Sequence, residues 1–304
     1  MPVNTIEYGA TLQKKLDQKA VNDMTSGWMD ANAGDVIYNG GKKIKVPTIV
    51  TTGLKDYDRA KGYPEGSVNL SYEDMEMTMD RSTSFTLDAM DVNESNFVAT
   101  ATGVAGVFQQ EQVVPEVDAY RYSKLAAYAP ESNVLTYTPE ASTILAKLKY
   151  DIAFVQDIVG ENVPLMCIMN SLVKAQLEEL DKFQKMIDVV DFTKGTITTK
   201  VKAIDNCVIN PVPSARMYDT YTFMDGVTEG EEAGGFAKGT TAKMMNWIIV
   251  PKKVPIAVTK QDKMKIIDPD TYQAADAWFM GYRRYHELWV KLQQRNQIRV
   301  SKQA

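Results

Sequence analysis

The 304-residue sequence contains few of the residues that form reactive centres, with one histidine and two cysteines. His286 lies between Tyr285 and Glu287, and no motif offers it the partners of a metal site or a Ser-His-Asp triad. We therefore expect a structural or surface histidine. The chain also lacks a P-loop, a Gly-x-Gly-x-x-Gly motif after a strand and a Cys-x-x-Cys motif. The sequence thus predicts no catalytic residue, no metal ligand and no cofactor.

Long apolar runs and a basic stripe are absent as well. No run approaches the roughly 18 residues of a membrane-spanning helix, and the start Met1-Pro2-Val3-Asn4 does not resemble a signal peptide. The net charge of −5, with a pI of 5.2, argues against a dedicated nucleic-acid binder. Cys167 and Cys207 lie in apolar, strand-like runs, which predicts buried free thiols in a reducing, cytosolic setting rather than a disulfide.

Two acidic pairs, Asp56/Asp58 and Glu231/Glu232, are candidates for the general acid and base of a carboxylate-based hydrolase. Both lie in glycine-rich or charged loops, where solvated carboxylates are the ordinary outcome. The adjacent arginines at 283–284 could bind phosphate, although a salt-bridged strand face is the expected structure. We expect a protein that is not an enzyme and keep the hydrolase as the alternative from another functional class.

The chain does contain a long stretch of alternating apolar and polar residues between positions 66 and 88. The apolar side chains lie first at even positions and, after a change of phase at 73–74, at odd ones: Val68, Leu70, Tyr72, then Met75, Met77 and Met79. This period of two predicts extended chain with one apolar edge, for which no partner strand is evident. An isolated ribbon is marginal in water, so a projecting one must lie on another surface. This points to an assembly.

A long, interrupted helix follows the ribbon. Asp91-Val92-Asn93-Glu94 forms a capping box, and Phe97, Val104 and Phe108 belong to the apolar stripe that comes after it. Pro115 predicts a kink or restart, because the residue before a proline is driven toward extended geometry. The element at 93–129 would span roughly 55 Å, which is typical of a spine rather than of a part of a closed globule.

The N-terminal residues 1–34 are polar and weakly periodic, with Trp28 alone among polar neighbours. An exposed tryptophan is unfavourable, so we expect Trp28 to dock on a neighbouring subunit or, equally, on its own domain. Residues 36–38 and 44–50 flank an Asn-Gly-Gly turn and predict a hairpin. The 16 methionines suit either adaptable contact surfaces or a core.

Beyond Pro130 the pattern predicts a second, α/β domain. It comprises a helix from Thr138-Pro139 to Gly160, a buried strand at 163–169 and a helix that Ser171 caps and that ends at Leu180. The remaining expected elements are strands at 197–203, 207–209, 247–250, 255–258 and 264–267, a loop at 225–240, and aromatic-rich strands at 278–300 that return to the spine. The predicted class is α+β.

Four segments in this order resemble the major capsid proteins of tailed bacteriophages, the Hong Kong 97-type fold, of the kind found in phages and prophages of Gram-positive bacteria. They are MDVNES (90–95), VPEVDAYR (114–121), WIIVPK (247–252) and WFMGYRRY (278–285). The resemblance covers most of the chain from about residue 35 onward. It implies an N-terminal arm at 1–34, an extended loop at 50–90, a peripheral domain at 35–49, 91–130 and 247–296, and an axial domain at 131–246 and 297–304.

The same resemblance implies a structural role in the virion. Pentamers and hexamers would form an icosahedral shell around double-stranded DNA. The implied partners are a scaffold protein, a portal protein and, in some relatives, decoration proteins. The shell would assemble in the host cytoplasm and contain no membrane. The implied subunit-interface residues are Trp28, Asp56, Tyr57, Arg59, Lys61, Tyr63, Leu70, Tyr72, Met75, Met77 and Met79. The implied spine-helix residues are Phe97, Val104, Phe108 and Pro115.

The sequence departs from the founding member of the family in two respects. No long charged pro-segment precedes the arm, so a scaffold is expected to be a separate or removed protein. Lys55 and Lys61 lie in the loop that some relatives crosslink, but no matching asparagine and glutamate context is present. We therefore expect non-covalent docking. An encapsulin-like nanocompartment shell is the alternative within the same fold.

Overall fold

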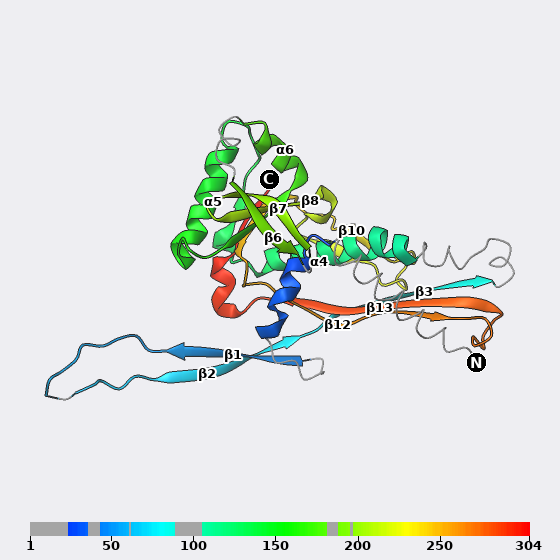
Figure 1. Ribbon diagram of the computed structural model, residues 1–304, viewed down its shortest axis with the longest axis horizontal. Helices are drawn as coiled ribbons and strands as arrows, with labels where there is room; N and C mark the ends of the chain where they lie inside the picture. The colour runs from blue at the N-terminus through cyan, green and yellow to red at the C-terminus, as the bar shows by residue number, and fades with distance from the viewer. Residues whose placement is uncertain (1–23, 36–42, 61, 89–104, 181–187, 195–196) are drawn as a thin grey trace.

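The computed structural model describes residues 24–35, 43–60, 62–88, 105–180, 188–194 and 197–304. Figure 1 shows an elongated molecule, with a mixed sheet-and-helix body from which a ribbon projects to the left and a long sheet extends to the right. The class is α+β, as the sequence predicts. The hairpin expected around 36–41 lies partly outside the described residues, as do the capping box, Phe97 and Val104.

The body is built on a seven-stranded sheet. Its order is β4 (Val134–Thr136), β14 (Arg299–Lys302), β11 (Met245–Pro251), β5 (Leu165–Asn170), β8 (Cys207–Val212), β7 (Ile197–Ile204) and β6 (Asp188–Lys194). Every residue of β11 is buried, because successive side chains enter opposite cores. Trp247 and Ile249 pack with α5 (Ile144–Val159) and α6 (Ser171–Glu178), whereas Ile248 packs on the other face with Trp28.

The sequence groups residues 247–250 with the strands that follow them, but the strand pairing differs. Strand β11 pairs with β5 and β14, so the segment 247–250 belongs to the seven-stranded sheet and not to the three-stranded one. The chain end also returns to the seven-stranded sheet, through β14. Residues 225–240 are mostly loop, but β10 (Phe236–Lys238) pairs with β9 (Tyr221–Phe223).

Both helix starts in this domain differ from the prediction. Helix α5 begins at Ile144 rather than after Thr138, because the Tyr137 hydroxyl accepts the Glu140 N–H at 3.3 Å and lies 2.8 Å from the Thr143 hydroxyl, which closes a turn instead. The N-cap of α6 is Asn170, whose side chain accepts the Leu172 N–H. Gly160, at φ 91°, ends α5 as expected.

A second, three-stranded sheet runs in the order β12 (Ile256–Ile267), β13 (Ala277–Trp289) and β3 (Met79–Asp88). The two short strands expected at 255–258 and 264–267 are one strand of 12 residues with an irregularity between Thr259 and Gln261. Phe108 packs against this sheet, with its ring 5.2 Å from Phe85 and 5.6 Å from Tyr282.

The spine helix passes through Pro115 without a break. A π-helical turn, Gln109–Val113, leads into α4 (Val114–Tyr128), and Val114 is helical at φ −62° and ψ −47°, so the expected extended geometry is wrong. Proline disfavours a helix interior because its ring clashes with the carbonyl four residues earlier. The Val114 N–H bonds instead to Gln109, five residues back, and this wider turn accommodates the ring.

Candidate assembly surface

The ribbon has a partner strand that the sequence did not reveal. Strand β1 (Lys43–Thr51) pairs antiparallel with β2 (Val68–Glu76) along its whole length, from Lys43 opposite Glu76 to Thr51 opposite Val68. In Figure 1 these two strands leave the body together and end in a long loop. Residues 44–50 were expected to pair with 36–38 across the Asn-Gly-Gly turn; the described partner of this strand is instead β2.

The apolar residues before and after the change of phase at 73–74 lie on opposite faces of this ribbon. Directly paired residues of an antiparallel ribbon share a face. One face carries exposed apolar side chains along its length, with exposed fractions of 73% for Val68, 50% for Leu70, 57% for Tyr72 and 63% for Ile49. The opposite face is buried near the body, where Val46 and Met75 join a cluster with Ile256 and Trp289. In β2 the even positions 68, 70 and 72 therefore face outward, whereas Met75 packs on the body of its own subunit; in β1 the parity is reversed, with Ile49 exposed and Val46 buried.

The three methionines that were expected at the subunit interface are instead buried within their own chain. Met75, Met77 and Met79 are 7%, 0% and 8% exposed, because they line the root of the ribbon and the start of β3. Trp28 is 2% exposed within the core of its own chain, so of the two alternatives for Trp28 the structure favours docking on its own domain. The sequence does not distinguish burial in the subunit's own core from burial against a neighbouring subunit, because both cover apolar side chains.

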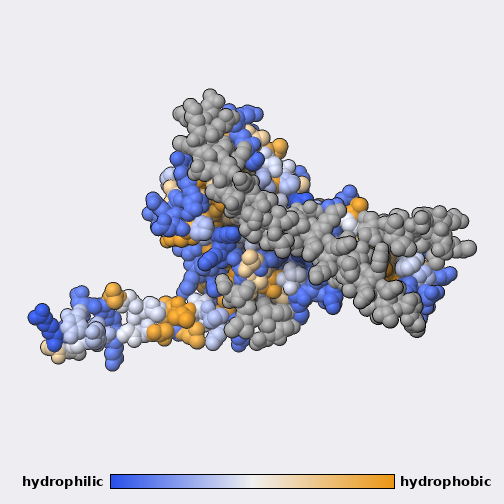
Figure 2. All heavy atoms as spheres, viewed as in Figure 1, coloured by the Kyte–Doolittle hydropathy of each residue, from blue (hydrophilic) through white to orange (hydrophobic). Residues whose placement is uncertain are grey.

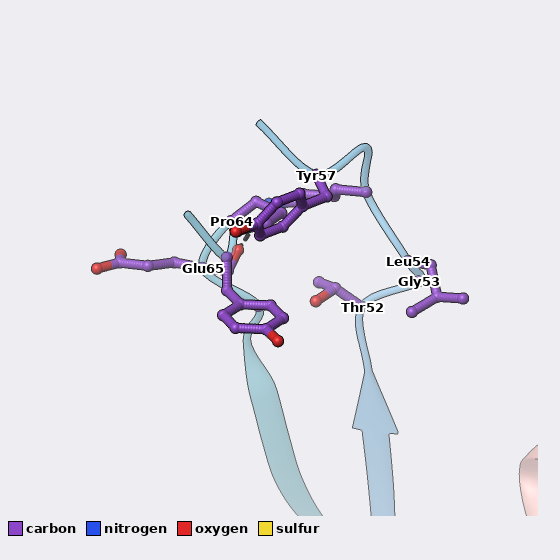
Figure 3. A pocket seen from close by; sticks show the side chains of 9 residues that line it. Thr52, Gly53, Leu54, Tyr57, Pro64 and Glu65 are labelled. Carbon is purple, nitrogen blue, oxygen red and sulfur yellow. Dashed lines mark hydrogen bonds between the residues drawn. The ribbon is translucent and has the colours of Figure 1, made fainter. Parts of the chain in front are cut away.

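The loop that joins β1 to β2 is ordered by its own contacts. The Asp58 carboxylate accepts the Ala60 N–H at 2.9 Å, and the Asp58 carbonyl accepts the Gly62 N–H at 2.7 Å. The rings of Tyr57 and Tyr63 meet edge to face at 5.3 Å. Figure 3 shows the loop curving around a hollow. The volume of this hollow is about 520 Å³.

The predicted loop residues lie in and beside this hollow. Tyr57 and Tyr63 line it and are 59% and 91% exposed, and Asp56 and Arg59 are exposed as well. Lys61 lies outside the described residues. The Lys55 ammonium donates to the Glu65 carbonyl at 2.8 Å.

One buried carboxylate of the body holds the chain at the point where the ribbon joins it. The buried Glu287 carboxylate accepts the Thr78 N–H at 2.9 Å, the Thr78 hydroxyl at 2.7 Å and the Tyr120 hydroxyl at 2.5 Å. Burial raises the pKa of Tyr120, and Glu287 raises it further, so this hydroxyl stays protonated and donates. The neighbouring His286 is 1% exposed, and burial lowers its pKa well below the ordinary value, so it is neutral.

A second set of contacts, which we call the hub, was not anticipated from the sequence. It consists of residues 116–121 of α4. Glu116 binds Arg81 of β3 at 2.8 Å, and Arg81 also donates to the carbonyls of Met224 at 2.5 Å and Gly235 at 2.9 Å. The buried Asp118 binds Arg216 at 2.9 Å. One turn of helix thus connects the three-stranded sheet with loops of the seven-stranded domain.

The segments that suggested chemistry do not form a site. Glu232 is exposed and accepts the Gly230 N–H, and Asp58 accepts backbone N–H groups of its own loop. Arg283 binds Asp80 at 2.6 Å and Arg284 binds Asp262 at 2.6 Å, as expected of a salt-bridged strand face. Cys167 and Cys207 are free thiols, and both are buried as predicted. In the part of the chain that the structure describes, no cluster of metal-ligating residues occurs.

None of the helices among the described residues is both long and apolar enough to cross a bilayer. Figure 2 shows a patch of apolar residues on the ribbon, and smaller apolar areas among the charged residues that cover much of the described body. The ribbon is therefore the clearest candidate for an assembly contact.

No family model matches the sequence, and no curated protein matches it. Solved structures do match. A chain from Microbacterium phage Oxtober96 has a TM-score of 0.56 at 11% identity, with 90% of this chain and 91% of that chain covered. A virus-like particle from Pyrococcus furiosus gives 0.55 at 12%, covering 97% and 99%. The capsid of Cyanophage P-SCSP1u gives 0.53 at 14%, covering 88% and 85%.

The chain has the Hong Kong 97-type capsid fold. Three of the four segments that carried the resemblance lie in described helices and strands. Residues 114–121 contain the hub, 247–252 include most of β11, and 278–285 form most of the first part of β13. The fourth, 90–95, lies outside the described residues. The resemblance therefore rests on the frame that holds the two sheets together.

Proposed function

We propose that this chain is the structural subunit of an icosahedral bacteriophage head, which assembles through pentamers and hexamers and encloses double-stranded DNA. The fold supports this role, because several solved phage capsid structures share it. The role needs no enzyme activity, cofactor or sequence-specific DNA contact. An acidic chain, with net charge −5, suits the wall of a DNA container, because it repels the packed phosphates.

One observation supports the proposal most strongly, namely the exposed apolar face of the ribbon. Val68, Leu70, Tyr72 and Ile49 all lie on that face and are each at least half exposed. A two-stranded ribbon gains little stability alone. If the ribbon of one copy binds a different patch of the next, the contact is heterologous, and such a contact generates a ring when the rotation between copies closes.

The parts of the fold suggest the following roles. The ribbon would be the extended loop, the three-stranded sheet with α4 the peripheral region, and the seven-stranded sheet with α5 and α6 the axial region. We assign the interface role to the exposed members of the predicted set, Asp56, Tyr57, Arg59, Tyr63, Leu70 and Tyr72. Scaffold, portal and decoration proteins remain proposed partners, with assembly in the host cytoplasm and a final location in the virion.

The test is assembly of the purified chain. We expect rings or shells by negative-stain imaging and fast-sedimenting species by analytical ultracentrifugation, either alone or with a co-expressed scaffold. A compact monomer under all these conditions would contradict the proposal. Denaturing gels of the particles should show single chains, because we propose non-covalent docking; a ladder of crosslinked chains would overturn that part alone.

An encapsulin-like nanocompartment shell is the second candidate, because the likeness to the virus-like particle from Pyrococcus furiosus covers 97% of this chain. The two roles differ in what the particles enclose. Particles isolated from the native source should contain nuclease-protected double-stranded DNA if the chain forms a phage head. Particles that enclose a co-purifying protein and no DNA would favour the nanocompartment.

A further inference from the structure

The segment at residues 24–35, which we call the strap, lies across the junction of the two sheets. It contains η1 (Gly27–Asp35), a 3₁₀ helix of nine residues. Runs of this length are uncommon because 3₁₀ hydrogen-bond geometry is poor. Packing must therefore hold the strap, and Met24, Trp28 and Met29 are 0%, 2% and 0% exposed.

The strap contacts both sides of the junction. On the seven-stranded side, the Asn210 side chain donates to the Thr25 carbonyl at 2.9 Å. On the other side, the Asn32 amide donates to the carbonyls of Lys252 at 2.8 Å and Pro255 at 2.7 Å. These two carbonyls belong to the short connection between β11 and β12, which is where the chain passes from one sheet to the other. Asn32 thus fixes the backbone of that connection.

The hub supplies the anchor of the strap. The Asp118 carboxylate, which is 0% exposed, accepts the Thr25 N–H at 3.0 Å and hydroxyl at 2.7 Å, and the Ser26 N–H at 3.0 Å and hydroxyl at 2.6 Å. Arg121 binds Asp30 through two hydrogen bonds, at 2.7 and 3.0 Å. A buried carboxylate with this many donors tolerates little displacement, since each lost bond leaves a desolvated group.

Three covalent connections also join the two sheets among the described residues, namely 129–133 after α4, 252–255 between β11 and β12, and 290–298 between β13 and β14. Each is short and free of regular α or β structure, so each can act as a hinge. The strap is a noncovalent connection in addition to these three. It binds the seven-stranded side through Thr25 and the hinge at 252–255 through the half-buried Asn32.

We propose that the strap locks the angle between the two sheets and thereby sets the curvature at which copies assemble. The effect on curvature rests on the proposed function, whereas the lock on the angle between the sheets does not. A segment that only filled the core would need Trp28 and Met29 but not the paired contacts of Asn32 or the salt bridge of Asp30. These polar contacts add direction, because hydrogen bonds constrain geometry in a way that apolar contacts do not.

The test uses the double variant Asp30→Asn/Asn32→Ala, which removes the charge opposite Arg121 and both contacts to the 252–255 connection. The matched control is Asp157→Asn/Asn162→Ala, which makes the same two changes at exposed positions outside the three connections. In hydrogen exchange on the unassembled chain, strap amides should exchange roughly tenfold faster in the variant than in the control. If strap amides of the unaltered chain already exchange like free coil, the lock does not exist.

The angle itself is measured by electron-spin distances between labels at Ser142→Cys and Ala275→Cys, which are exposed positions on the two sides. The width of the distance distribution should roughly double in the strap variant and stay unchanged in the control. An unchanged width, with a strap that exchanges faster, would overturn the lock. This measurement needs no assembly, so it stands even if the chain forms no shells.

The link to curvature is measured on particles. The diameter distribution of shells from the strap variant should be roughly twice as broad as that of the control, because a loosened hinge permits several curvatures. Shells of unchanged and uniform diameter, formed by a variant whose inter-sheet angle has loosened, would refute the curvature role. Failure of the control chain to form any shell would instead count against the proposed function.

Discussion

The substitution Leu70→Asp tests whether the exposed face of the ribbon is an assembly contact. Leu70 is 50% exposed in the subunit and lies opposite Ile49 on that face. Covering the exposed half of a leucine contributes about 1 kcal/mol. A carboxylate placed in the same contact adds a desolvation cost of about 2 kcal/mol or more. Each contact should therefore weaken by about 3 kcal/mol, which is roughly a hundredfold in its dissociation constant.

The control is Asn69→Asp, which adds the same charge one residue away on the opposite face, where Asn69 pairs with Val50. Both positions are exposed in the subunit, so the unfolding free energy of the free chain should change by less than about 0.5 kcal/mol in either variant. The assay is the protein concentration at which light scattering and sedimentation first detect particles. We expect this concentration to rise strongly for Leu70→Asp and little for Asn69→Asp.

Two outcomes would refute the reasoning. Equal rises for both variants would show that added charge, and not the apolar face, determines assembly. An unchanged threshold for Leu70→Asp would show that this face is solvent-exposed in the particle. Salt dependence separates the first case further, because screening weakens a charge effect but leaves apolar burial intact.

Three further predictions concern the subunit itself. Below about pH 6.5 His286 becomes protonated in the unfolded chain but not in the folded chain, so the free energy of unfolding should fall on acidification by up to about 1.4 kcal/mol per pH unit. Between pH 7 and 5.5 the urea midpoint should fall less for His286→Gln than for the unaltered chain. An identical fall would contradict this. Trp28→Ala should cost about 3–5 kcal/mol in urea unfolding, whereas a cost near zero would place Trp28 outside the core. Arg81→Ala releases the carbonyls of Met224 and Gly235, so a glutamate-specific protease should cut the 225–235 loop faster; unchanged cleavage would show that this contact does not hold the loop.

The alternation of the ribbon could be recognised in the sequence, but its consequences could not all be derived. The alternation with a period of two residues and its change of phase at 73–74 are local properties, so they can be read from the sequence. Whether an apolar position faces its own core or a neighbour depends on which strand pairs with it. That partner, β1, lies beyond a 16-residue loop at 52–67, and pairing at such separation leaves no local signal. Leu70 and Met75 therefore looked alike although the structure places them on opposite faces.

The spine and the strap show two other limits of sequence patterns. Pro115 predicts a kink or restart because the rule concerns α-helical geometry. The structure avoids the conflict with a π turn, which the composition of 109–113 does not predict. One signal in the sequence could have indicated the hub. Charged and apolar residues alternate at 116–121, which is typical of a helix that other elements cover on several sides. Asp118 and Arg121 at the centre of a buried helix require fixed partners. Those partners, Ser26 and Asp30, lie about ninety residues earlier in the chain.

The contacts divide into a strong internal set and a weak external one, and this division bears on how assembly proceeds. The hub carboxylates and the two terminal nitrogens of Arg121 are hydrogen-bonded within one chain, so these contacts form before the subunit meets a copy. The four side chains of the exposed ribbon face would contribute about 1 kcal/mol each, or about 4 kcal/mol together. That free energy alone corresponds to a dissociation constant near 1 mM. A single ribbon contact is thus too weak to hold a pair of subunits, whereas a closed ring engages every ribbon at once and gains from multivalency. Weak individual contacts also let a misplaced subunit leave before the ring closes, which is what a shell with many copies requires.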